Sequence, residues 1–262
     1  MTIADKVAIV TGSGGVGCGR AIAHRFAKEG AAVVVSDIHC ERGEEVRSQI
    51  EESGGRAAFF ATDVRVEEQV RELVAFAEKT FGALHILVNN ASAPFRPGEP
   101  LDHWQDTVQT DLLGTMYATR AAIDALRRSG GGAIVNISSI SALWHGRPTH
   151  NASPSYDLAK AGVIRLTTGL AWLGAKEGIR VNCLAPGWIA VPEVLAYWHT
   201  LTPEQRRERS VPSRLLETSQ IADAVISLVT DENLAGRVMV WWSEDEPGLI
   251  PWADRGYTAL EC

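Results

Sequence analysis

The chain has 262 residues, of which 45% are hydrophobic and 22% are charged, so it has enough apolar material for the core of a globular protein. Its 32 acidic residues outnumber its 25 Lys and Arg residues, and the net charge of −7 argues against a protein that binds nucleic acid or anionic membranes. The four cysteines have no CxxC spacing, and no His, Cys and Asp cluster has metal-ligand spacing, so the sequence predicts neither a disulfide scaffold nor a metal site.

The N-terminal segment MTIADKVAIVTG has no charged region followed by a long apolar stretch, which a signal peptide needs. No apolar run approaches the ~18 residues of a membrane helix. We therefore expect a cytoplasmic protein that does not enter the membrane.

Short apolar, β-branched runs alternate with longer amphipathic stretches along the chain. Such runs are typical of strands that are buried on both faces of a parallel sheet. The predicted strands are Val7–Val10, Ala32–Val35, Ala57–Phe60, Ile86–Val88, Ala133–Ile137, Ile179–Leu184 and Val238–Trp242. The predicted helices are Arg20–Glu29, Glu41–Glu52, Val66–Thr80, Leu101–Arg128, Ser155–Lys176 and Ser219–Thr230. This alternation predicts an α/β fold, a Rossmann-type doubly wound parallel sheet of about seven strands with helices on both faces, and a single domain over residues 1–262.

The first predicted strand leads into the glycine-rich segment Thr11–Gly19. Glycine allows a tight turn and a close approach to a pyrophosphate, which the first N–H groups of the following helix would bind. A flexible turn without a ligand is the alternative, but the strand before the segment and the helix after it favour dinucleotide binding. A P-loop is excluded because Cys18, and not Lys, follows Gly17.

Asp37 ends the second predicted strand, 20 residues after Gly17. A carboxylate at this position accepts hydrogen bonds from the ribose hydroxyls and repels a 2′-phosphate, which predicts NAD in preference to NADP. A solvated acid at a strand end is the alternative interpretation. Arg42 is the one basic residue nearby that could weaken the preference for NAD.

Tyr156 and Lys160 are four residues apart and therefore share one helix face. A tyrosine titrates near ~10, so proton exchange at neutral pH needs a shift of ~3 pKa units, or ~4 kcal/mol, toward phenolate. A neighbouring ammonium acts in that direction. Upstream, Ser138 and Ser139 place hydroxyls at the carboxyl end of a strand, where open α/β sheets bind ligands.

Together these residues resemble the short-chain dehydrogenase/reductase superfamily over nearly the whole chain. The glycine segment is similar to the TGxxxGxG turn of that family, with one extra residue, and Asn89-Asn90-Ala91-Ser92 is similar to its NNAG strand end. The resemblance implies a catalytic set of Ser139, Tyr156, Lys160 and Asp111. It implies a cofactor site formed by Gly12, Ser13, Gly17, Gly19, Asp37, Asp63, Val64, Asn90, Tyr156, Lys160, Pro186, Gly187 and Ile189.

Several further departures from the family pattern stand out. Asp111 replaces an Asn, Ser92 replaces a Gly, and Val191 replaces a Thr that contacts the nicotinamide amide. The spacing of 17 residues between Ser139 and Tyr156 is long, and the added residues include His145, Arg147 and His150, which are solvated loop residues or contacts for an anionic substrate.

The resemblance places a substrate loop at about residues 188–216. Trp188, Tyr197 and Trp198 in this loop either line a pocket or only pack, and both interpretations stay open. Trp241, Trp242 and Trp252 favour packing of the C-terminal segment or a subunit contact.

We therefore expect an NAD(H)-dependent oxidoreductase that interconverts a secondary alcohol and a ketone, with Tyr156 as the general acid/base. By resemblance, it forms a homodimer or homotetramer through the helices Leu101–Arg128 and Ser155–Lys176. The alternatives are dehydration or epimerisation on the same scaffold, and a non-catalytic NAD-binding protein.

Overall fold

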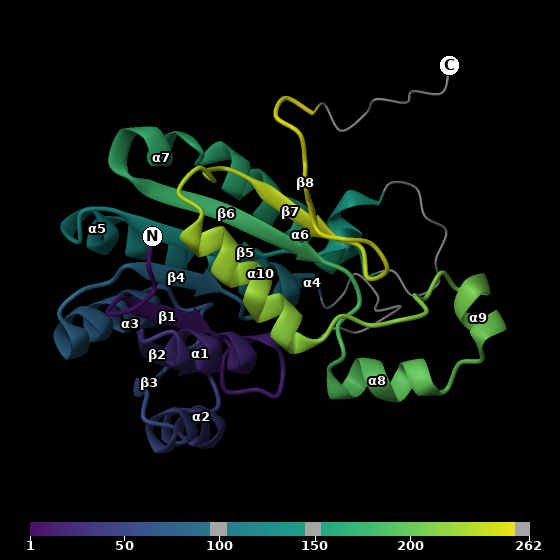
Figure 1. The fold of residues 1–262 in the computed structure, drawn as a ribbon, viewed down its shortest axis with the longest axis horizontal. Coiled ribbons are helices and arrows are strands. Elements are labelled where there is room, and N and C mark those ends of the chain that lie inside the picture. The colour runs from purple at the N-terminus through teal and green to yellow at the C-terminus, as the bar shows by residue number, and fades with distance from the viewer. Residues whose placement is uncertain (95–103, 145–152, 255–262) are drawn as a thin grey trace.

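The structure, a computed structural model, describes residues 1–94, 104–144 and 153–254. Within them, eight strands form one sheet in the order β3-β2-β1-β4-β5-β6-β7-β8 (Figure 1). The strands are β1 (Val7–Thr11), β2 (Ala32–Asp37), β3 (Arg56–Ala61), β4 (Ile86–Asn89), β5 (Gly132–Ile137), β6 (Ile179–Pro186), β7 (Val238–Trp241) and β8 (Gly248–Leu249). The first seven are parallel, and only β8 pairs antiparallel, with β7. The seven predicted strands are therefore confirmed, and β8 is an addition to them.

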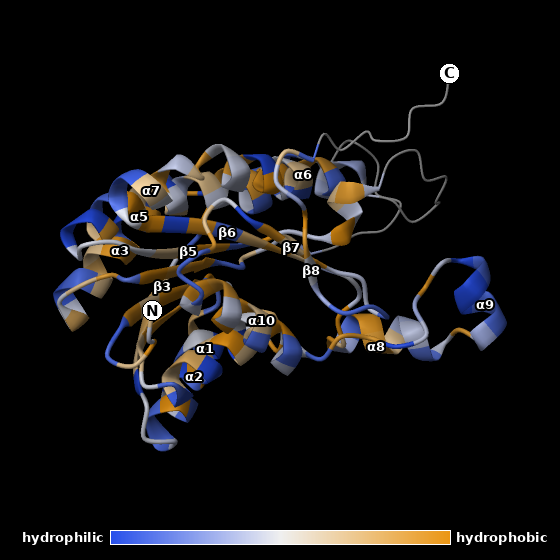
Figure 2. Cartoon of the chain, turned by 45° about the horizontal axis from the view of Figure 1, so that its top comes forward, coloured by the Kyte–Doolittle hydropathy of each residue, from blue (hydrophilic) through white to orange (hydrophobic). Residues whose placement is uncertain are grey.

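Helices cover both faces of the sheet, which confirms the doubly wound α/β prediction (Figure 2). One layer consists of α1 (Cys18–Lys28), α2 (Cys40–Glu52) and α10 (Thr218–Thr230). The other consists of α3 (Glu67–Phe81), α5 (Thr115–Arg128), α6 (Pro154–Gly169) and α7 (Trp172–Glu177). No helix in the described ranges is both long and apolar enough to cross a membrane.

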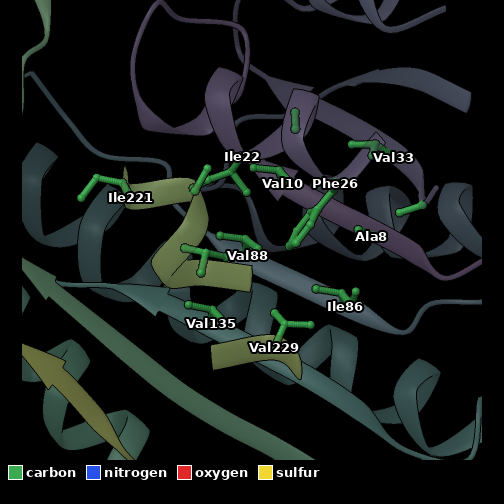
Figure 3. Close-up of a cluster of buried hydrophobic side chains, with 14 of the residues drawn as sticks. Ala8, Val10, Ile22, Phe26, Val33, Ile86, Val88, Val135, Ile221 and Val229 are labelled. Atoms are coloured by element: carbon green, nitrogen blue, oxygen red, sulfur yellow. The ribbon is translucent and has the colours of Figure 1, made fainter. Parts of the chain in front are cut away.

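Each face of the sheet has its own core because successive strand side chains point to opposite faces. Ala8, Val10 and Val33 face α1 and α10, where Phe26 and Val229 are fully buried (Figure 3). The other face of the same strands packs against α3 and α5. Burial on both faces explains why the strand sequences are continuously apolar rather than alternating.

The predicted helix Leu101–Arg128 is interrupted in the described part of the chain. It consists of α4 (Trp104–Thr107), a π-helical turn η2 (Val108–Gly114) and α5, while its first residues lie outside the described ranges. The predicted helix Ser155–Lys176 is divided into α6 and α7. A π-helical turn adds a residue to a helical turn and is common at functional sites.

Residues 190–215, which we call the outer segment, contain two helices that the sequence did not predict. They are α8 (Pro192–His199) and α9 (Pro203–Glu208), and Figure 1 shows them apart from the sheet. The base of the segment is closed by backbone hydrogen bonds: Ala190 N–H donates to Leu216 O at 2.8 Å, and Leu216 N–H donates to Trp188 O at 2.8 Å. The outer segment lies within the predicted substrate loop.

Candidate active site

The glycine segment forms a tight turn between β1 and α1 at the point where the strand order reverses. Gly12 has a φ of +63°, and a Cβ there would lie 2.7 Å from Ala91 Cα. A Cβ on Gly19 would lie 2.3 Å from the Gly12 carbonyl oxygen, so helix and loop meet too closely for a side chain. Among the described residues no side chain caps α1 at Gly17, which leaves the first N–H groups of the helix to bind an anion.

Asp37 lies at the carboxyl end of β2 and holds the glycine segment in place. Its Oδ2 accepts a hydrogen bond from Gly14 N at 2.9 Å, and its Oδ1 accepts one from His39 N at 2.9 Å. Each carboxylate oxygen keeps a further lone pair, so two more donors, such as ribose hydroxyls, can bind.

A cavity of about 470 Å³ lies against the glycine segment and the ends of β2, β3 and β4, and we call it the dinucleotide cleft. Seven of the predicted cofactor residues line it, namely Gly12, Gly17, Gly19, Asp37, Asp63, Val64 and Asn90. Ser13 does not, because its hydroxyl donates to Val10 O at 2.8 Å and its backbone N–H donates to Ser36 O at 3.1 Å. The volume is within the range of small-molecule sites.

Asn90 and Asp63 have partners that the sequence did not reveal. The Asn90 side-chain amide donates to the carbonyls of Thr11 and Gly12, both at 3.0 Å, and so joins the end of β4 to the glycine segment. Asp63 forms an ion pair of 2.7 Å with Arg65, whose hydrogen bonds hold the pKa of Asp63 below its ordinary value.

Ser139, Tyr156 and Lys160 come together between the end of β5 and the start of α6. Lys160 Nζ lies 5.4 Å from the centroid of the Tyr156 ring and donates to Ile137 O at 3.1 Å. Ser139 follows β5 and forms a hydrogen bond with Tyr156. Its Oγ also accepts a hydrogen bond from Ser141 N at 3.2 Å, which orients the hydroxyl.

Asp111 lies in the π-helical turn and forms a buried ion pair with Lys160. Its Oδ1 is 2.9 Å from Lys160 Nζ, and the two side chains are 0% and 3% exposed. The Asp111 backbone carbonyl accepts a hydrogen bond from the Thr115 hydroxyl at 2.8 Å. The structure therefore brings Asp111 next to the predicted catalytic residues, and its carboxylate makes the contact with Lys160.

Ser92, which in the sequence is only a departure from the family pattern, is part of this site. Its hydroxyl donates to Asp111 Oδ1 at 2.5 Å, and the neighbouring Ala93 N–H donates to Asp111 Oδ2 at 2.9 Å. Ser92 and Asp111, two of the positions that depart from the family pattern, are thus direct partners. The sequence signal for this contact is that both positions depart from the family pattern.

The ion pair changes the acid–base properties of both catalytic candidates. Burial raises the pKa of Tyr156, the Lys160 charge and the Ser139 hydrogen bond oppose this rise, and the Asp111 charge adds to it. Burial by itself would lower the pKa of Lys160, but Asp111 and Tyr156 raise it above its ordinary value. Lys160 is therefore a cation, and part of its effect on Tyr156 is cancelled by Asp111.

The remaining predicted residues lie at the end of β6, beside the outer segment. Gly187 N–H donates to Trp241 O at 2.7 Å, directly after Pro186, and Ile189 pairs with Leu216. Trp188 lines a second cavity, together with Trp242, so both are pocket residues. Tyr197 stacks on Trp188, and Trp198 contacts Arg206. His145, Arg147 and His150 lie outside the described residues.

Comparison with known proteins identifies the family of the chain. A family model described as short chain dehydrogenase matches residues 6–200. The cis-4-hydroxycyclohexanecarboxylate dehydrogenase of Sinomonas cyclohexanicum is 35% identical, over 98% of each chain. The cyclohexanol dehydrogenase of Acinetobacter sp. (strain SE19) is 34% identical, over 87% of this chain and 89% of its own.

A solved structure of 7α-hydroxysteroid dehydrogenase with NADH and 7-oxo glycochenodeoxycholic acid has a TM-score of 0.81 to this chain. It is 29% identical, and the match covers 92% of this chain and 94% of that one. The similarity therefore extends over most of the chain and its fold.

We expect Asp111→Asn to shift the ionisation of Tyr156 to lower pH. Removing the buried anion removes a charge that disfavours the phenolate, so the pKa of Tyr156 falls. The limb of the kcat/KM profile that reports Tyr156 should move to lower pH, with activity near neutrality retained or raised. Asp124→Asn, at an exposed acid on α5, is the control and should leave the profile unchanged. Superimposable profiles for Asp111→Asn and wild type would contradict the electrostatic role.

Proposed function

The chain belongs to the short-chain dehydrogenase/reductase family and is an oxidoreductase, and we propose that it interconverts a secondary alcohol and a ketone with NAD(H). The observation that carries this proposal is the grouping of Ser139, Tyr156 and Lys160 at the carboxyl edge of the sheet, next to the dinucleotide cleft. The names of the relatives support it, because each describes a dehydrogenase of a hydroxyl-bearing compound. The substrate hydroxyl lies on a saturated ring in this proposal, as those names indicate for the relatives.

Tyr156 is the general acid/base of the proposed reaction. During oxidation its phenolate oxygen accepts the hydroxyl proton of the alcohol, and during reduction the phenol returns that proton to the carbonyl oxygen. Ser139 donates a hydrogen bond to the same substrate oxygen and stabilises negative charge on it. Lys160 favours the phenolate through its charge, against the effects of burial and Asp111.

The dinucleotide cleft fits the nicotinamide cofactor. Gly12 and Gly19 leave no space for a side chain of their own. Among the described residues no side chain caps the first turn of α1, and the Asp37 carboxylate, which lines the cleft, keeps free lone pairs. In our proposal the glycine segment holds the pyrophosphate, Asp37 the adenosine ribose, and Asp63 and Val64 the adenine. Bound NAD(H) would supply the hydride acceptor or donor.

Tyr156→Phe tests the catalytic assignment. We expect kcat to fall by at least about 100-fold, because the phenol is the proton donor and acceptor, with NADH affinity nearly unchanged. Tyr117→Phe on α5 is the control and should keep wild-type kcat. Steady-state rates with cyclohexanol, together with NADH titration by fluorescence, measure both effects. Retention of most of kcat in Tyr156→Phe would refute the assigned role.

Asp37→Ser tests the preference for NAD over NADP. The wild type should bind NADH more tightly than NADPH, since the Asp37 carboxylate repels a 2′-phosphate. In the variant the ratio of the affinities for NADH and NADPH should fall by about 10-fold. Asp63→Ser, at the same cleft, should lower the affinity for NADH and for NADPH by a similar factor. Equal affinity of the wild type for NADH and NADPH would contradict the proposal.

We also propose that the chain assembles as a homodimer or homotetramer through α5 and α6. Large apolar side chains are exposed on this side of the molecule: Leu158 of α6 is 61% exposed, Met116 of α5 is 42% exposed and Trp172 of α7 is 50% exposed. Light scattering at micromolar concentration should report an oligomer, and Leu158→Glu should weaken it. A wild-type protein that is only monomeric would contradict this proposal.

A further inference from the structure

A second cavity, of about 450 Å³, lies between the outer segment and the carboxyl ends of β5 and β6. Ile140, which lines it, directly follows Ser139 in the chain. Trp188, which also lines it, directly follows the Pro186-Gly187 turn. Two lining residues are therefore sequence neighbours of residues in the proposed active site. We call this cavity the tryptophan cavity.

The walls of the tryptophan cavity are aromatic. The ring centroids of Trp144 and Trp242 are 5.8 Å apart, and the Trp188 ring stacks on Tyr197 at 6.1 Å. Flat indole surfaces bury a large apolar area and suit a saturated ring.

The wall that carries Trp242 is held firmly against the end of β6. Trp188 N–H donates to Ser243 Oγ at 2.8 Å, and a Cβ on Gly187 would lie only 2.5 Å from that same oxygen. Glycine at 187 is therefore needed for this close approach. The position of this wall relative to the end of β6 is thereby set by the fold.

Four charged residues line the cavity, namely Arg206, Arg207, Glu244 and Asp245, and they differ in whether they have partners. Arg207 pairs with Glu204 at 2.9 Å, and both are exposed. Glu244 is exposed and accepts a hydrogen bond from Ser213 N at 2.6 Å. Arg206 is half-buried and, within the described residues, has no acidic group within 4 Å.

The guanidinium of Arg206 is held in position by an aromatic ring and a backbone carbonyl. Its Cζ lies 3.3 Å from the centroid of the Trp198 ring, and its Nη2 donates to Trp198 O at 3.1 Å. Trp198 is in turn fixed by a hydrogen bond from its Nε1 to Pro212 O at 2.9 Å. Arg206 Nε is buried without a hydrogen-bond partner in the described residues, an unusual state for a charged group.

We infer that the tryptophan cavity binds the part of the substrate remote from the reacting hydroxyl, and that Arg206 binds a carboxylate there. The substrate class is a secondary alcohol on a saturated ring that also carries a carboxylate. A planar guanidinium already fixed by stacking matches a carboxylate and loses little entropy on binding it. This inference rests on the proposed function, because it concerns the substrate of the same site.

Calorimetric titration in the presence of NADH tests Arg206 without requiring turnover. Cyclohexanecarboxylate should bind the wild type at least about 10-fold more tightly than the neutral, similarly shaped cyclohexanecarboxamide. Arg206→Gln should weaken carboxylate binding by about 10–100-fold, the range for a hydrogen bond to a charged group, and change amide binding less than about twofold. Arg207→Gln, in the same cavity, should keep the wild-type preference for the carboxylate over the amide. Arg206→Lys, which keeps the charge but loses the planar group, should give an intermediate affinity.

Three results would overturn the inference: no preference of the wild type for the carboxylate, equal losses for both ligands in Arg206→Gln, or an equal effect of Arg207→Gln. If Arg206→Gln does not fold, the wild-type preference and Arg206→Lys decide. Turnover of 4-hydroxycyclohexanecarboxylate and its amide separates this inference from the proposed function. Oxidation of both at equal kcat/KM would contradict the carboxylate contact only, whereas selective binding with no oxidation of either would contradict the proposed reaction only.

Discussion

A parallel sheet that is buried on both faces is the constraint on which the rest of this structure depends. Parallel strands must be joined by crossovers, and here those crossovers are the helices that bury the two faces. All carboxyl ends of the parallel strands consequently lie at one edge of the sheet. Asp37, Asn90, Ser139 and the Pro186-Gly187 turn, which lie far apart in sequence, meet at that edge because each one ends or follows a strand.

The buried pair of Lys160 and Asp111 is the costliest feature of this edge. Two charges removed from water are tolerated only when further hydrogen bonds compensate for the lost hydration. The Asp111 carboxylate receives hydrogen bonds from Ser92 and Ala93, and the Lys160 ammonium donates to the Ile137 carbonyl. The pair therefore connects α6, the π-helical turn and the loop after β4, and it sets the charge around Tyr156.

The outer segment differs from the sheet in how little of it is buried. Neither α8 nor α9 contains a buried residue, and the segment is held mainly at its base and by its own contacts, such as Arg206 on Trp198. Few buried apolar contacts mean low local stability, which is the usual condition of a segment that admits ligands. In our proposals the residues at the sheet edge carry out the reaction, and the outer segment selects the substrate.

The sequence by itself determined the seven parallel strands, the glycine turn and the helix face shared by Tyr156 and Lys160, because each depends on local periodicity or spacing. It did not determine β8, whose two residues are too short to show a periodicity and are defined by pairing with β7. It also did not determine the π-helical turn, which has nearly the same apolar pattern as an α-helix. The contact of Ser92 with Asp111, and the packing of Arg206 on Trp198 beside a cavity, were decided only by the tertiary structure. Each is a contact between side chains of separate elements, and local sequence does not encode the relative position of such elements.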